Sequence, residues 1–106
     1  MKKSAQAIAA IKYEQGYIVF YFHSFWYQEE IKFLSEQLLS SLSTIQLLET
    51  IAGADRENIR FIWQINYYFS LNFDCYSQSC WLEGEDEKSH EQLVRLIPFF
   101  KGSEVH

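Results

Sequence analysis

Two cysteines, Cys75 and Cys80, are the side chains best suited to covalent chemistry, and four residues separate them. A pair at this spacing can form a disulfide or act as a redox pair. A metal site would need further cysteine or histidine ligands nearby, whereas His23, His90 and His106 lie far away along the chain. In a reducing compartment the two cysteines are expected to be inert thiols flanking a hairpin turn. We keep the redox pair as an alternative, and predict no metal and no cofactor.

His23 and Ser24 are adjacent and have the residue types of a base and a nucleophile. The sequence supplies no third group that would orient the histidine, and no serine lies in a G-x-S-x-G pattern. Ser24 is suited to capping a helix instead, because its hydroxyl can accept a backbone N–H from the first turn. His90 is expected in the first turn of the last helix, exposed to solvent. We therefore predict no catalytic residue.

The acidic run at residues 83–87 contains four carboxylates around Gly84. It lacks the alternating oxygen ligands and the final bidentate glutamate of an EF-hand loop. Acidic residues are also favourable at the beginning of a helix, where they interact with the helix dipole. The run is therefore interpreted as the approach to a helix. Four isolated glycines cannot form a phosphate-binding loop.

The charge of the chain argues against nucleic acid and membrane surfaces as partners. The net charge is −5, and only two of the nine basic residues, Lys2 and Lys3, are adjacent, so no basic stripe is present. No apolar run reaches the ~18 to 20 residues of a membrane span. The run from Ser4 to Ile11 is too short and too polar for a signal peptide. We expect a cytoplasmic protein of bacterial type, whose acidic charge would favour a basic partner.

Residues 59–76 form the longest alternating stretch of the sequence. Its odd positions are apolar or aromatic and predict a face that packs on the core. Its even positions are mostly polar but uncharged, which is unusual for an exposed face. Tyrosine, serine and asparagine are the residues that antibody paratopes use for contact. The sequence therefore predicts a protein-binding or self-association surface, with these candidate residues: Tyr17, Tyr21, Gln64, Asn66, Tyr68, Ser70 and Asn72. The alternative is that a third layer, such as the last helix, covers this face.

The first expected element is a hairpin over residues 7–22 with its turn at Gln15 and Gly16. This register pairs Glu14 with Tyr17 and Tyr13 with Ile18. One face then carries Ala9, Ile11, Tyr13, Ile18, Phe20 and Phe22, and the other carries Lys12, Glu14, Tyr17, Val19 and Tyr21. A register shifted by one residue would move Lys12 to the apolar face, so the polar residues determine the pairing.

A helix is expected from Phe25 to Leu42 after the cap at Ser24. Apolar residues recur there at helical spacing and form one stripe: Tyr27, Ile31, Leu34, Leu38 and Leu42. Residues 44–51 are predicted to be a strand because they are rich in β-branched residues and alternate loosely. A helix over residues 43–52 is the alternative. Residues 53–58 have the composition of a turn.

The stretch 59–76 would extend roughly 60 Å as one strand, which is too long for this chain. It is therefore expected to bend sharply, to form a bulge or to turn back on itself near residues 66–68. A further hairpin turn is predicted at Ser77 and Gln78, followed by a short strand over residues 80–83. Ser89 and Gln92 match a capping box for a last helix, which Pro98 should end or kink. The apolar face of that helix comprises Leu93, Leu96, Ile97 and Phe100.

These elements predict a single α+β domain over residues 1–106, with residues 1–5 and 102–106 frayed. The expected order is β-β-α-β-β-β(-β)-α, an antiparallel sheet of about five strands with two helices packed on one face. The predicted function is non-catalytic contact with a protein partner or with a second copy of the chain, through the polar sheet face, as in an adaptor, an immunity protein or a chaperone-like module. One alternative is a ligand-binding domain or enzyme with a pocket between sheet and helices, using tyrosine, asparagine and His23. Another is a thiol redox sensor using Cys75 and Cys80.

Overall fold

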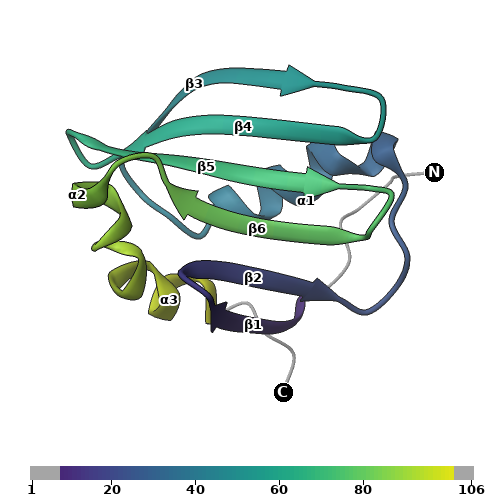
Figure 1. The fold of residues 1–106 in the computed structure, drawn as a ribbon, viewed down its shortest axis with the longest axis horizontal. Coiled ribbons are helices and arrows are strands. Elements are labelled where there is room, and N and C mark those ends of the chain that lie inside the picture. Colours follow the sequence, from purple (N-terminus) through teal and green to yellow (C-terminus); the bar gives the residue numbers. More distant parts are fainter. Residues whose placement is uncertain (1–7, 102–106) are drawn as a thin grey trace.

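The computed structural model describes residues 8–101, in which one antiparallel sheet carries its main helices on a single face (Figure 1). The sheet has six strands where about five were expected: β1 (Ile8–Glu14), β2 (Tyr17–Phe22), β3 (Ile45–Ala52), β4 (Arg56–Trp63), β5 (Tyr67–Asp74) and β6 (Ser79–Gly84). The helices are η1 (Gln28–Glu30), α1 (Ile31–Leu39), α2 (Glu87–His90) and α3 (Leu93–Lys101). The strand order in the sheet is β1-β2-β6-β5-β4-β3. The predicted α+β class is confirmed, and the frayed ends expected at residues 1–5 and 102–106 lie outside the described residues.

The hairpin β1–β2 has the predicted register, with Glu14 opposite Tyr17 and Tyr13 opposite Ile18. Gln15 and Gly16 both have positive φ, at 52° and 85°, as a two-residue hairpin turn of type I′ requires. The pairing shifts between Ile8 and Ala10, and this bulge buries Ile8 completely, whereas Ala9 is only partly buried. The expected core position of Ala9 is therefore taken by Ile8.

The first helix begins later than its apolar stripe suggests. Residues 25–27 are not helical, and Trp26 is buried against the ring of Phe73 while Tyr27 is 61% exposed. The side chain of Gln78 explains this difference, because it accepts the N–H of Trp26 at 3.0 Å and donates to the Trp26 carbonyl at 2.9 Å. The predicted cap at Ser24 is therefore wrong, and Tyr27 is the residue that precedes η1.

The helix α1 keeps the rest of the predicted stripe. Ile31, Leu34, Leu38 and the following Leu42 are all buried against the sheet. The strand prediction for residues 44–51 is also confirmed, and the helical alternative is wrong. β3 is an edge strand with a bulge at Leu48, and most of its residues are exposed.

The alternating stretch 59–76 divides into β4 and β5 at a turn over residues 64–66, slightly earlier than expected. Trp63 lies opposite Tyr67, so the loop has three residues and the odd positions stay on the same face in both strands. Phe61 and Phe69 stack across this pair on the core side. Ile65 is the exception to the apolar pattern, because it lies in the turn and is 87% exposed.

The C-terminal helices differ from the prediction in the residue that caps them and in their continuation past Pro98. Asp86 caps α2, and its carboxylate accepts the N–H of Ser89 at 2.7 Å, so the predicted cap at Ser89 is wrong. Ser89 is fully buried, and its hydroxyl accepts the N–H of Tyr68 at 2.7 Å. α3 continues through Pro98 to Lys101 and buries Leu93, Leu96 and Phe100 as expected, with Phe100 edge-on to Phe20.

The core lies between the helices and the odd-numbered side of β4 and β5. The largest fully buried side chains come from both layers: Trp26, Phe20, Phe61, Phe69, Phe73 and Phe100. Within residues 8–101, no helix is long and apolar enough to cross a membrane.

Candidate protein-interaction surface

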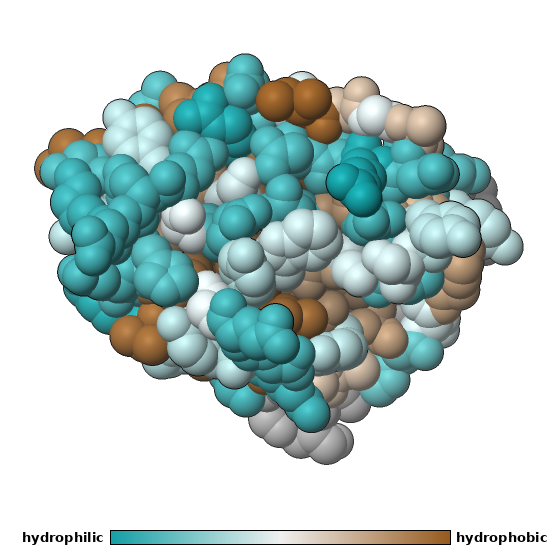
Figure 2. All heavy atoms as spheres, viewed as in Figure 1, coloured by the Kyte–Doolittle hydropathy of each residue, from teal (hydrophilic) through white to brown (hydrophobic). Residues whose placement is uncertain are grey.

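The side of the sheet opposite α1 and α3, called here the open face, is covered by no helix among residues 8–101 (Figure 1). A row of paired residues crosses all six strands on this face: Lys12, Val19, Trp81, Asn72, Asn58 and Ile51. Figure 2 views this face and shows hydrophilic and intermediate side chains with small hydrophobic areas between them. The expected alternative, a third layer formed by the last helix, is wrong because α3 packs on the other face through Phe100.

Asn58, Ser70, Asn72 and Glu83 form a cross-strand group on β4, β5 and β6, called here the amide network. The Asn58 side chain donates to Ser70 Oγ and to Asn72 Oδ1, both at 2.6 Å. Asn72 in turn donates to Glu83 Oε2 at 3.0 Å. Ser70 is buried and the amides are half-buried. These polar groups therefore satisfy one another within the chain.

Charged residues also lie on the open face, although the pattern of residues 59–76 suggested few. Arg60 makes two hydrogen bonds with Glu85, at 2.6 and 2.8 Å, and one with Glu49 at 3.0 Å. The bonds to Glu85, followed by the bond to Glu49, raise the pKa of the Arg60 guanidinium above its usual value. Such pairs fix the geometry of the face more than they stabilise the fold.

The acidic run at residues 83–87 does not act as one unit. Glu83 accepts from Asn72, Glu85 pairs with Arg60, and Asp86 caps α2. The bonds from Ser89 lower the pKa of the Asp86 carboxyl. Within residues 8–101 no three His, Cys, Asp or Glu side chains are grouped so that they could hold a metal ion.

The seven predicted contact residues occupy four different places. Gln64 and Asn66 lie in the β4–β5 turn, beyond the strands. Tyr68 is half-buried where α2 meets β5, while Ser70 and Asn72 belong to the amide network. Tyr17 and Tyr21 lie on β2 and line a hollow of the open face.

This hollow, called here the β2–β6 groove, has a volume of about 520 Å³. β2 and β6 pair only at Ile18 with Leu82 and at Val19 with Trp81. The lining of the groove comes from β1, β2, β6 and the β5–β6 turn: Glu14, Tyr17, Val19, Phe20, Tyr21, Ser77, Gln78, Ser79, Cys80, Trp81 and Glu83.

Trp81 and Glu83 were absent from the predicted set, although the sequence contains a signal for them. Residues 80–83 alternate, and Cys80 and Leu82 are fully buried in the core. Side chains alternate between the two faces of a strand, so Trp81 and Glu83 must lie on the open face. The sequence does not show that β6 lies beside β2, so it could not indicate that they meet Tyr17 and Tyr21.

The two cysteines are free thiols in different surroundings. Cys80 is fully buried, and this burial raises the pKa of its thiol well above the usual value. Cys75 is half-buried, and its thiol donates to the Trp26 carbonyl across 3.8 Å. Burial of Cys80 as a protonated thiol disfavours its reaction with oxidants.

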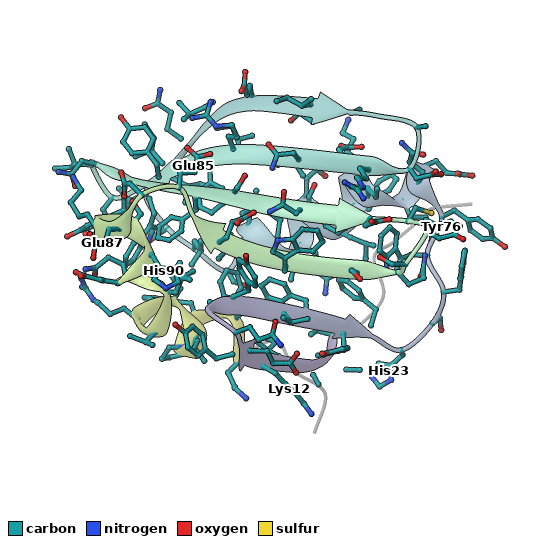
Figure 3. The ribbon with its side chains drawn as sticks, in the orientation of Figure 1. Lys12, His23, Tyr76, Glu85, Glu87 and His90 are labelled. Atoms are coloured by element: carbon teal, nitrogen blue, oxygen red, sulfur yellow. The ribbon has the colours of Figure 1, made fainter. Side chains whose placement is uncertain are left out.

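His23 and His90 lie at opposite ends of the structure (Figure 3). His23 borders a shallow hollow of about 330 Å³ together with Ser24, Phe25 and Tyr21. His90 lies against the β1–β2 turn, where its ring would be 3.1 Å from a Cβ added to Gly16. The two histidines therefore cannot act together.

One protein family, described as Protein of unknown function (DUF3630), has a sequence model that matches residues 8–98. No curated protein and no solved structure matches the chain.

Proposed function

The chain belongs to the DUF3630 family, and from its geometry we propose that it is a small, acidic, non-catalytic cytoplasmic domain that binds protein through the open face. The partner is another protein or a second copy of the chain. The observation that carries the proposal is the position of Tyr17, Tyr21 and Trp81 around a groove on a sheet face that no described helix covers.

The tyrosines of this face have the exposure expected of contact residues. Tyr17 is 39% exposed and Tyr21 is 41% exposed, and both belong to a regular strand that fixes their backbone. A tyrosine buries much area on binding at small entropic cost, because it has only two rotatable side-chain angles. Groups of exposed aromatic side chains on a soluble protein often mark an interaction site.

The test compares two double variants in affinity capture from the source lysate. In the first variant, Tyr17→Ser and Tyr21→Ser remove the aromatic side chains from the open face. The matched control, Tyr27→Ser and Tyr76→Ser, removes two exposed tyrosines that do not line the groove. Sedimentation velocity of each purified protein measures self-association.

We expect a stoichiometric partner, or a dimer, that the control variant retains and the face variant loses. Equal capture by both variants, together with an unchanged monomer, would exclude the open face as the contact surface. Circular dichroism of each variant establishes that the fold is intact before binding is compared.

A further inference from the structure

We infer that the β2–β6 groove binds a cationic side chain, an arginine or a lysine, presented by a basic segment of the partner. This inference rests on the proposed function and adds the chemistry of the partner. It depends on the shape of the groove, on its aromatic walls and on the sign of its charges.

The shape of the groove follows from the strand pairing. In an antiparallel pair the contacts at Ile18–Leu82 and Val19–Trp81 would continue to Phe20 with Cys80 and to Tyr21 with Ser79. These pairs do not form, although β6 stays paired with β5 along its other edge, Cys80 with Phe73 and Ser79 with Asp74. The gap beside Tyr21 opens the groove, and its volume of about 520 Å³ accommodates one long side chain and the backbone around it.

The walls of the groove are aromatic. Tyr17, Tyr21 and Trp81 surround Val19, with Trp81 directly opposite Val19. Cations are attracted to the faces of such rings, most strongly to tryptophan. The chain provides an internal example, because Lys12 places its Nζ 6.0 Å from the centroid of the Tyr21 ring. Figure 3 shows Lys12 beside this part of the sheet, on β1.

The charges of the groove are both negative. Glu14 and Glu83 line it, and its lining contains no lysine or arginine. Glu14 accepts the hydroxyl of Tyr21 through both oxygens, at 3.1 and 3.0 Å, and Glu83 accepts from Asn72. A carboxylate has about four acceptor positions, so both retain capacity for a further donor. Partial desolvation of the Tyr21 hydroxyl, with the bond to Glu14, raises the pKa of this phenol, which stays neutral at physiological pH.

The combination of two carboxylates with aromatic walls favours a cationic ligand. An anionic ligand would be repelled by the two carboxylates, and a neutral apolar side chain would further desolvate their charges without supplying a counter-charge. A guanidinium can stack on the rings and bond a carboxylate at the same time. The net charge of −5 would also increase the rate at which a basic segment approaches.

The test is a ¹H–¹⁵N NMR titration of the full chain with blocked arginine amide, and separately with blocked citrulline amide, its neutral isostere. A third arm uses blocked lysine amide. The indole N–H of Trp81 is the reporter, and those of the buried Trp26 and Trp63 are internal references. We expect saturable shifts at Trp81 with arginine and a response at least five-fold weaker with citrulline.

Two matched variants locate the binding charge. Glu83→Gln should weaken arginine binding at least three-fold, whereas Glu85→Gln, whose carboxylate lies outside the groove against Arg60, should leave it unchanged. Lys12→Gln should strengthen binding, because it removes the internal cation from the Tyr21 ring. Unshifted Trp26 and Trp63 signals in each variant indicate an intact core.

Equal responses to arginine and citrulline, or equal losses in Glu83→Gln and Glu85→Gln, would overturn the inference. A face-dependent partner without any arginine response would also overturn it, while leaving the proposed function in place. An arginine response without a face-dependent partner or dimer would support the groove chemistry and overturn the proposed function.

Discussion

The two halves of the open face differ both in residue type and in what their side chains contact. On β4 and β5, Asn58, Ser70 and Asn72 bond to one another and to Glu83. On β2 and β6, Tyr17, Tyr21 and Trp81 surround an open groove. Polar composition alone therefore does not mark a contact surface, because the polar groups bond across the strands in one half and the aromatic rings line a hollow in the other.

The difference arises from the length of strand pairing. β4 and β5 pair at eight consecutive positions, from Arg56–Asp74 to Trp63–Tyr67. Side chains directly opposite each other in such a ladder are about 4.5–5.5 Å apart at Cβ, close enough for amides to bond. β2 and β6 pair at two positions only, so the side chains on either side of that contact face a gap.

The largest expected effect concerns Gly84, the last residue of β6, where α2 packs on the sheet. A Cβ at this position would lie 2.4 Å from the backbone nitrogen of His90. Gly84→Ala should therefore push α2 away, weaken the bond from Tyr68 to Ser89, and lower the free energy of unfolding by about 1–3 kcal/mol. Urea unfolding measures this loss.

Gly53→Ala is the matched control, because its added Cβ would have ordinary contact, 3.8 Å from the Arg56 carbonyl oxygen. Its unfolding midpoint should be close to that of the native chain. If the two alanine variants were equally stable, the close packing of α2 on β6 would not hold in solution.

The next effect should arise within the amide network. Asn58→Ala removes the donor of both 2.6 Å bonds, so the half-buried side-chain carbonyl of Asn72 loses the hydrogen bond from Asn58. We expect a loss of about 1–3 kcal/mol in the free energy of unfolding, the range for leaving buried polar groups unpaired. Asn66→Ala, in the exposed turn, should change little. Equal losses in the two variants would contradict the division of the open face into two halves.

A smaller, pH-dependent effect is expected at Asp86. The bonds from Ser89 lower its pKa in the folded chain, so its contribution to stability is complete above the unfolded pKa, near 3.9. That contribution is lost as pH falls through the lower folded pKa. Asp86→Asn keeps the cap acceptor but cannot titrate, so its deficit relative to the native chain should shrink as pH falls below that unfolded pKa. Urea unfolding from neutral to acid pH tests this, and parallel curves would exclude the role of the Asp86 charge.

The smallest effect on stability is expected at the groove. Tyr17→Ser with Tyr21→Ser should shift the free energy of unfolding by no more than about 0.5 kcal/mol per residue, because both side chains are exposed. The same variant is expected to lose its partner. A large loss of stability would instead mean that the tyrosines support the fold, and would remove the contrast with the amide network.

The sequence predicted the elements whose signals are local. Lys12 and Glu14 allow only one register of the first hairpin, and that register is confirmed. Ile31, Leu34 and Leu38 define the buried stripe of α1 by spacing alone. The odd positions of residues 59–76 mark the core face of two strands, because the three-residue loop preserves the alternation. Because the alternation continues through the loop, it did not indicate where the turn lies.

Features that depend on distant partners could not be predicted in this way. Trp26 is held by Gln78, which lies 52 residues further along the chain, so the local helical pattern at residues 25–27 was misleading. Ser89 has the sequence context of a cap, but the backbone of Tyr68 uses its hydroxyl. The groove requires β2 to lie beside β6, a pairing between strands separated by five other elements. Alternation indicates which residues share a face but not which strands are neighbours.

The bulge at Leu48 interrupts an edge strand that is open to pairing with other chains. β3 is an edge strand that exposes Leu47 and Ile51, and a smooth edge of this kind is a template on which further chains can add strands. The extra residue interrupts the ladder between Leu47 and Glu49 and increases the local twist, so an incoming strand would find a mismatched edge. Deletion of Leu48 would restore a regular edge, and the chain would then be expected to form fibrils at concentrations where the native protein stays in solution.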